Sequence, residues 1–176
     1  IRNTGGIHLE GKNCGDGGDS TFNVNNNYIA NNSGPGILDR WGLGYIRYNR
    51  IHNNSTYHDS NYDPHMMASA IGAGGSTIEY NTVTGGIVEP LGGSCCSVEN
   101  RLILITRNYS GGSSSNINNN NFVINTEPYL AYVGSDWGSP YDITNNWWGG
   151  TTDTTELDAL MHDWNDDVSY NFIDYS

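Results

Sequence analysis

One six-residue pattern returns along this chain: an apolar residue, two other residues, Asn, one further residue and a second apolar residue. A copy with Arg in place of Asn fills the widest gap, and consecutive central residues are then 22, 32, 20, 19 and 26 positions apart. Such steps suit one coil of a β-solenoid per repeat, because each coil buries its inward side chains against its neighbours. The copies are Val24/Asn27/Ile29, Ile46/Asn49/Ile51, Ile78/Asn81/Val83, Val98/Arg101/Ile103, Ile117/Asn120/Phe122 and Ile143/Asn146/Trp148.

The central Asn predicts a bend in each coil. The flanking apolar residues stand three positions before and two positions after it, so a straight strand of period two would send them to opposite faces. Asn tolerates the left-handed conformation that a bend needs. Its amide can also bond to the same amide one coil further on, which predicts a ladder of stacked Asn side chains.

A second recurring signal predicts another strand in each coil. In three copies it is Gly followed by Ile, where Gly supplies the turn that enters the strand, and in two further copies another pair of residues stands in the equivalent place. The 23 Gly and 25 Asn residues agree with a turn-rich, helix-poor chain. We therefore expect an all-β fold, a parallel β-helix of about six or seven coils. The copies are Gly6-Ile7, Gly36-Ile37, Ala70-Ile71, Gly86-Ile87 and Leu130-Ala131.

The end of the chain follows a different pattern. Between Thr154 and Trp164 the residues Leu157, Leu160, Met161 and Trp164 stand at helical spacing, and Asp153 or Thr154 can cap such a helix. An amphipathic helix after the last coil would cover its exposed core. The expected organisation is residues 1–150 as coils, with a long loop at 53–67, and residues 151–176 as a C-terminal cap.

The Asn-centred coils, followed by Asn145-Asn146-Trp147-Trp148-Gly149, an Asp-rich short helix and Asp166-Asp167, resemble right-handed parallel β-helix proteins of the pectate-lyase-like superfamily. The resemblance implies an extracellular or cell-surface protein, and a family that holds polysaccharide lyases, hydrolases, epimerases, adhesins and carbohydrate-binding solenoids. Family members usually begin with a capping helix, whereas Ile1 to Glu10 already reads as part of a coil. The N-terminal edge is therefore expected to be open, or covered by more chain or by a second copy stacked end to end.

Charge limits the partners. The net charge of −12 argues against nucleic acid and anionic membranes, and no signal peptide or membrane-inserting segment is recognisable. The few cations include Arg47, Arg50 and Arg101, which could form a basic strip or could balance Glu79 and Glu99 across the stack.

Metal and cysteine chemistry remain open. The loop from Asn13 to Asp19 offers the carboxylates of Asp16 and Asp19 to Ca²⁺, but too few oxygen ligands on its own. The cofactor expectation is therefore none, or Ca²⁺ there. Cys14, Cys95 and Cys96 leave free thiols and oxidised arrangements as alternatives.

The densest cluster of chemical groups lies in the long loop. His58, Asp59, Asp63 and His65 could fold over Asp39, Arg40 and Glu89 and form a catalytic groove, since glycosidases need two facing carboxyl groups. Strand alternation would instead turn Asp39 or Glu89 inward as a hydrogen-bonded bend residue.

Aromatic residues, among them Tyr45 and Tyr141, are expected mostly at outward or loop positions, where sugar rings can stack on them. The candidate carbohydrate-binding residues are Trp41, Tyr48, Tyr57 and Tyr80. Tyr48 and Tyr80 directly precede Asn49 and Asn81, so adjacent coils should align them as a ladder, which would also stabilise the stack by itself.

Two functions follow from these features. The first is a non-catalytic extracellular solenoid that acts as a surface fibre or a carbohydrate-binding structural domain, with a polysaccharide or surface glycan as partner. The second is a polysaccharide lyase or glycoside hydrolase, or a C-terminal fragment of one. The near absence of Lys, with Lys12 alone, and the lack of a legible catalytic set favour the first.

Overall fold

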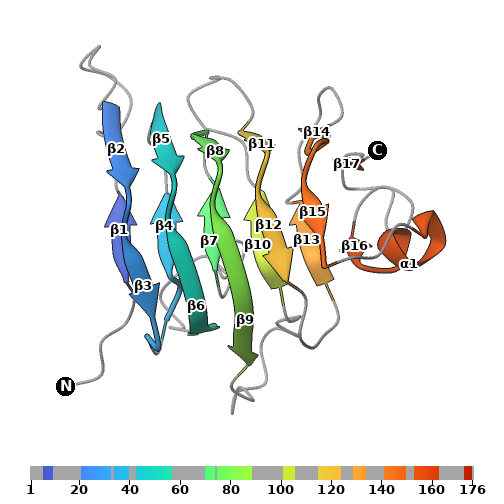
Figure 1. Ribbon diagram of the computed structural model, residues 1–176, viewed down its shortest axis with the longest axis horizontal. Helices are drawn as coiled ribbons and strands as arrows, with labels where there is room; N and C mark the ends of the chain where they lie inside the picture. Colours follow the sequence, from blue (N-terminus) through green and yellow to red (C-terminus); the bar gives the residue numbers. More distant parts are fainter. Residues whose placement is uncertain are drawn as a thin grey trace.

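The computed structural model is a stack of short β-strands that runs from the N-terminal to the C-terminal end of the chain (Figure 1). It describes residues 6–9, 21–32, 34–39, 43–56, 70–73, 75–88, 101–105, 115–123, 129–133, 141–149, 153–162 and 173–175. For residues 43, 55–56, 73, 86–88, 101–105, 129–133 and 162 the description covers the backbone alone.

Three long sheets and one short pair of strands make up the stack, and the strand pairs of the described residues are parallel. Sheet A contains β1 (Ile7–Leu9), β4 (Ile37–Asp39), β7 (Ile71–Ala73), β10 (Arg101–Ile105), β13 (Tyr129–Val133) and β16 (Met161–His162). Sheet B contains β2 (Thr21–Asn25), β5 (Leu43–Arg47), β8 (Thr77–Glu79) and β11 (Asn116–Asn118). Sheet C contains β3 (Tyr28–Ala30), β6 (Arg50–Thr56), β9 (Thr82–Val88), β12 (Asn121–Val123) and β15 (Trp147–Trp148). The short pair is β14 (Tyr141–Asp142) with β17 (Ile173–Asp174).

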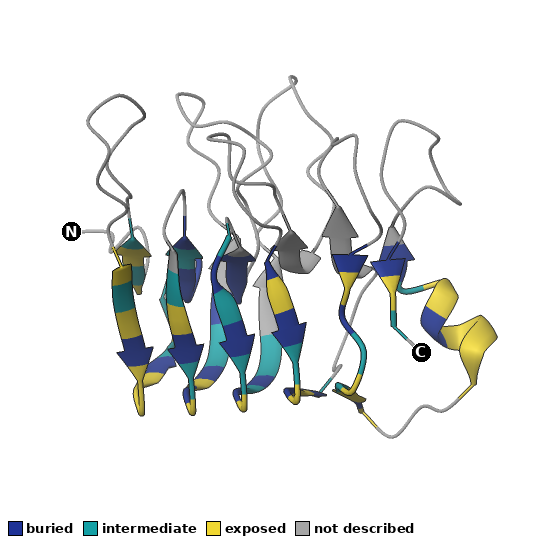
Figure 2. Ribbon diagram, turned by 90° about the horizontal axis from the view of Figure 1, so that it is seen from above, coloured by how far each residue is buried: buried dark blue, intermediate teal, exposed yellow. Residues whose placement is uncertain are grey.

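Successive coils place equivalent apolar residues side by side, and these columns form the core. In sheet B the register joins Val24, Ile46, Ile78 and Ile117. In sheet C it joins Ile29, Ile51, Val83, Phe122 and Trp148. All nine side chains are buried. Figure 2 shows buried residues as dark blue bands that recur on neighbouring strands of the stack. The prediction of a parallel β-helix is confirmed, and sheet A counts six coils.

Two assignments made from the pattern are wrong. Arg101 begins β10, which pairs with β7 and β13 in sheet A, so Val98/Arg101/Ile103 is not an Asn-bend repeat and Arg101 does not continue the line of Arg47 and Arg50. Gly86 lies opposite Asn54 in sheet C and therefore does not match Gly36. Coils of unequal length cause both errors, because the step from Asn81 to Asn120 is a single coil of 39 residues.

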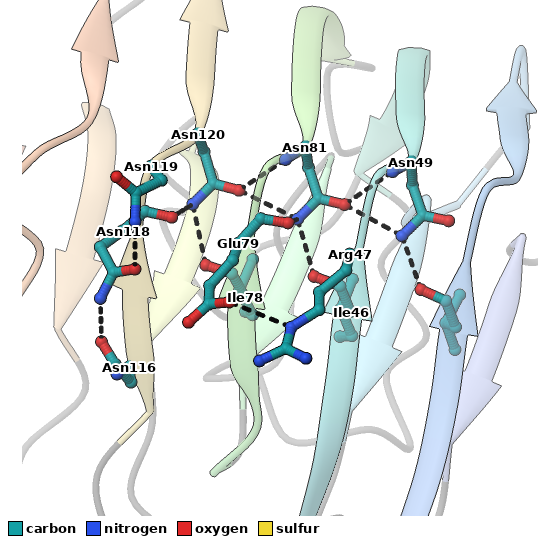
Figure 3. A network of polar contacts seen from close by, with 11 residues as sticks. Ile46, Arg47, Asn49, Ile78, Glu79, Asn81, Asn116, Asn118, Asn119 and Asn120 are labelled. Atoms are coloured by element: carbon teal, nitrogen blue, oxygen red, sulfur yellow. Dashed lines mark hydrogen bonds and ion pairs between the residues drawn. The ribbon is translucent and has the colours of Figure 1, made fainter.

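The predicted Asn ladder runs along the outer corner between sheets B and C (Figure 3). From Asn49 onward, each side-chain oxygen accepts hydrogen bonds from the backbone N–H and the side-chain amide of the preceding Asn, at 2.8–3.1 Å. Each amide from Asn49 onward also donates to a carbonyl of the preceding coil. The corner is thus closed by side chains where the sheet hydrogen bonds stop. The rungs are Asn27, Asn49, Asn81, Asn120 and Asn146.

The C-terminal helix is shorter than its spacing suggests. Helix α1 spans Thr154–Asp158 at the C-terminal end of the stack (Figure 1), and the Asp153 carboxylate caps it by accepting from the backbone of Thr155. Leu157 is buried, but Met161 belongs to β16, where the sheet A register pairs it with Ala131. A longer helix would remove Met161 from this fully buried core position, so sheet pairing prevails over helical periodicity. Trp164 lies outside the described residues.

Candidate carbohydrate-binding surface

The residue directly before each ladder Asn, and not the ladder Asn itself, adopts the left-handed conformation of the bend. We call these residues the pre-ladder column: Asn26, Tyr48, Tyr80, Asn119 and Asn145, with φ between 56° and 61°. Asn tolerates this conformation, whereas a bulky side chain there costs about 1–2 kcal/mol. The two tyrosines, in two adjacent coils, therefore carry the highest conformational cost in the column.

Tyr48 and Tyr80, the tyrosine pair, stack on one another across these coils. Their ring centroids are 5.2 Å apart with an angle of 6° between the planes, and the side chains are 56% and 49% exposed. Each ring covers one face of the other. The outer face of Tyr48 is therefore directed towards the first coil, which contains β2 and β3, and the outer face of Tyr80 towards the fourth coil, which contains β11 and β12. The predicted tyrosine ladder is present, but it comprises two rungs.

Charged side chains border the pair on sheet B. Arg47 lies in register with Glu79, and its Nε is 3.0 Å from the Glu79 carboxylate. The Nε–H group is poorly aligned with the carboxylate for a hydrogen bond, so we describe the contact as an ion pair. The same guanidinium lies 3.9 Å above the ring of Tyr45. This confirms that Arg47 balances Glu79, whereas Glu99 lies outside the described residues.

Residues just after the ladder add a further aromatic–cation contact. Tyr28 and Arg50 are in register on sheet C, and the Arg50 guanidinium lies 5.6 Å from the ring centroid of Tyr28. Tyr28 and Trp147 are both exposed. The sequence analysis missed these two residues as surface aromatics, although the signal was available: each directly follows a ladder Asn, one position before an inward residue, so strand alternation turns it outward.

The fourth coil presents a chain of surface amides beside Tyr80. Asn119 donates from Nδ2 to the side-chain oxygen of Asn118 at 3.0 Å, and Asn118 donates to that of Asn116 at 2.5 Å (Figure 3). Asn118 is in register with Glu79. Because each amide fixes the next, this surface offers oriented donors and acceptors for hydroxyl groups.

Among the residues expected in a catalytic groove, only Asp39 is described. It is buried at 1% exposure and accepts a hydrogen bond from the Ser76 hydroxyl, also buried, so it points inward as strand alternation allows. Tyr141 is buried too, contrary to the outward position expected for it. The other candidates lie outside the described residues: Arg40, Glu89, His58, Asp59, Asp63 and His65, the sugar-binding candidates Trp41 and Tyr57, the calcium candidates Asp16 and Asp19, and Cys14, Cys95 and Cys96.

Metal-ligating clusters and membrane-crossing helices were sought in the described part of the chain. No three His, Cys, Asp or Glu side chains there gather closely enough to hold a metal ion. The described helix is also too short to cross a membrane.

Comparison with known proteins gives no match at the level of family models, curated proteins or solved structures. The arguments about function therefore rest on the geometry of this chain.

Proposed function

We propose that the protein is a non-catalytic, extracellular β-solenoid that binds a polysaccharide or surface glycan along the corner that carries the Asn ladder. The observation that carries this proposal is the exposed tyrosine pair held in left-handed backbone. Stacking contributes about 0.5–1.5 kcal/mol, which at most offsets the backbone cost of one of the two tyrosines. Asn fills the same column in three other coils without that cost. Residues kept in unfavourable conformations at a surface are candidates for binding.

The chemistry of the corner suits sugars. The apolar C–H face of a pyranose packs against a tyrosine ring, while its hydroxyl groups exchange hydrogen bonds with Asn amides, which both donate and accept. A rigid stack of coils holds these groups at fixed spacing, so little conformational entropy is lost on binding. The net charge of −12 disfavours nucleic acid as an alternative partner.

The test is affinity electrophoresis of the protein through gels that contain neutral or uronate polysaccharides. We expect retardation by at least one polysaccharide, and a loss of at least tenfold in affinity, about 1.4 kcal/mol, for the double variant Tyr48→Asn/Tyr80→Asn. This variant restores the residue that the column uses elsewhere, so the fold should persist, as circular dichroism can verify. Tyr45→Thr is the matched control, since Thr77 occupies the equivalent position one coil further on. Retardation that is unchanged in the double variant would refute the proposal.

The polarity of the Asn ladder favours a second role, in end-to-end assembly. Within the described residues, the side-chain oxygen of Asn27 accepts no hydrogen bond at the N-terminal end of the ladder, where Asn27 only donates to Asn49 and Asn25. Strands β1, β2 and β3 form the edges of their sheets beside Asn27. A second copy whose C-terminal end packs against this edge could donate to the Asn27 oxygen, and that C-terminal end is formed by β16 and β17, which continue the stack beyond β13 and β14. Sedimentation velocity and electron microscopy test this role: concentration-dependent filaments that Asn27→Ala weakens support it, and monomers at all concentrations refute it.

A further inference from the structure

The polar residues around the tyrosine pair are distributed unevenly between coils. Towards the N-terminal end the pair meets the first coil, whose outward residues are Asn23, Asn25 and Asn26, all exposed. Towards the C-terminal end it meets the fourth coil, whose outward residues are Asn116, Asn118 and Asn119. The tyrosine pair is thus bounded on both sides by uncharged amides. The charged residues Arg47 and Glu79 lie in the same two coils as the tyrosines, between the two sets of amides.

Each outer ring face therefore adjoins a set of amides. The outer face of Tyr48 is directed towards the level of Asn26, and the outer face of Tyr80 towards the level of Asn119, because these residues precede their ladder Asn in the same column. A ring face beside amide donors and acceptors is the combination that a pyranose requires. The inner faces are occupied by the stack, so sugar can pack only at the two ends of the pair.

We infer that the tyrosine pair is the shared wall between two sugar subsites, one at Tyr48 and Asn26 and a stronger one at Tyr80 and Asn119, and that both take neutral pyranoses. The inference rests on the proposed glycan binding and specifies its ligand class. The levels of the first and fourth coils are three coil steps apart, about 14 Å at about 4.8 Å per step. A short oligosaccharide therefore fills one subsite, and a long one can reach both.

The difference in strength follows from the amide contacts. Asn119 is held by Asn118, which is held by Asn116, so the remaining oxygen of Asn119 and the remaining N–H groups are already oriented. Asn26 makes no side-chain hydrogen bond in the described part of the chain, so its amide must be ordered by the sugar. Ordering a side chain costs binding free energy, which makes the Tyr80 subsite the tighter one.

The preference for neutral sugars follows from the charges. Arg47 is already paired with Glu79, and Glu79 lies in register with Asn118 at the edge of the Tyr80 subsite. A uronate carboxylate placed there would face Glu79, and the nearest cation on the described part of sheet B, Arg47, is already engaged by Glu79. The amides that form both subsites carry no charge, so they recognise hydroxyl groups.

The experiment uses the full chain and two sets of probes: neutral hexaoses of glucose, mannose, xylose or galactose, and a hexagalacturonate, titrated by calorimetry. Three variants, Asn26→Ala, Asn119→Ala and Asn145→Ala, remove an amide from the same column and the same left-handed backbone. Asn145 lies one coil beyond the Tyr80 subsite and is the matched control. We expect at least one neutral hexaose to bind, with about a tenfold loss for Asn119→Ala, a smaller loss for Asn26→Ala and no change for Asn145→Ala.

The outcomes separate this inference from the proposal on which it rests. Binding of hexagalacturonate but of no neutral hexaose would overturn the neutral subsites and leave glycan binding intact. Binding of a neutral hexaose with equal effects of all three variants, or with none, would overturn the two subsites alone. If the wild-type protein binds none of the hexaoses and no gel polysaccharide retards it, the proposed function fails and this inference fails with it.

Discussion

The side-chain oxygen of Asn81 accepts two hydrogen bonds from Asn49, one from its backbone N–H and one from its side-chain amide, each 2.9 Å long. Asn81 then donates from Nδ2 to Asn120 in the same way. A single buried side chain therefore satisfies the polar groups of the bend before it and is itself satisfied by the bend after it. The ladder makes each corner of the solenoid depend on the next coil.

We expect Asn81→Ala to lower the free energy of unfolding by about 3 kcal/mol or more, because it leaves buried donors of Asn49 without an acceptor, at about 1–3 kcal/mol each. The matched control is Asn27→Ala at the exposed end of the ladder, where no earlier rung loses its acceptor and the expected loss is below about 1 kcal/mol. Urea denaturation followed by circular dichroism measures both. Equal losses would show that the ladder contributes nothing beyond a single bend.

Residue chemistry explains what the sequence predicted well. The Asn ladder and the stacking of Tyr48 on Tyr80 were both predictable, because a repeated residue at a fixed offset must lie beside its copies in a parallel stack. The left-handed residue was placed one position too late, since the spacing of apolar residues locates a bend but does not say which peptide turns. Arg101 was assigned to the wrong sheet because only strand pairing, and not the distance along the chain, identifies a column when loops differ in length.

Gly36 is a position where the packing forbids a side chain. A Cβ atom there would lie 2.7 Å from Cγ2 of Ile51, 2.9 Å from the carbonyl oxygen of Ala70 and 2.9 Å from Nδ2 of Asn54. Gly36→Ala should therefore lower the free energy of unfolding by about 1–3 kcal/mol, as overpacking of a close-packed interior does. Thermal denaturation of the variant checks this.

Gly85 provides the contrast to Gly36. A second bend lies within or after the strands of sheet C, where Asn31, Asn53 and Gly85 occupy equivalent positions in successive coils. Their φ values are 57°, 47° and 64°. Gly85→Asn should therefore change the free energy of unfolding by less than about 1 kcal/mol. A large loss here would mean that the second bend does not repeat from coil to coil as its backbone indicates.

The ion pair between Arg47 and Glu79 should contribute little to stability. Both side chains are partly exposed, at 32% and 17%, and the Nε–H of Arg47 is poorly aligned with the carboxylate. A double-mutant cycle with Arg47→Gln and Glu79→Gln should give a coupling free energy of about 0.2–1 kcal/mol. The coupling should fall as NaCl is added, because salt screens exposed charges. A larger coupling that resists salt would mean that this pair is a structural clamp between the second and third coils.

Asp142 gives the fold a dependence on pH. Hydrogen bonds from the backbone N–H and then the hydroxyl of Thr144, at 3.0 and 2.8 Å, hold the pKa of this exposed carboxyl below its ordinary value of 3.8. Because the folded pKa is the lower one, the carboxylate stabilises the fold fully above the unfolded pKa, and this contribution is lost as the pH falls through the folded pKa.

Asp142→Asn keeps an oxygen acceptor but does not titrate. The stability difference between wild type and this variant should therefore shrink between about pH 5 and about pH 2.5, with other carboxylates cancelling in the comparison. Urea midpoints at the two pH values measure the change, and a difference that stays constant would show that Thr144 does not favour the charged form.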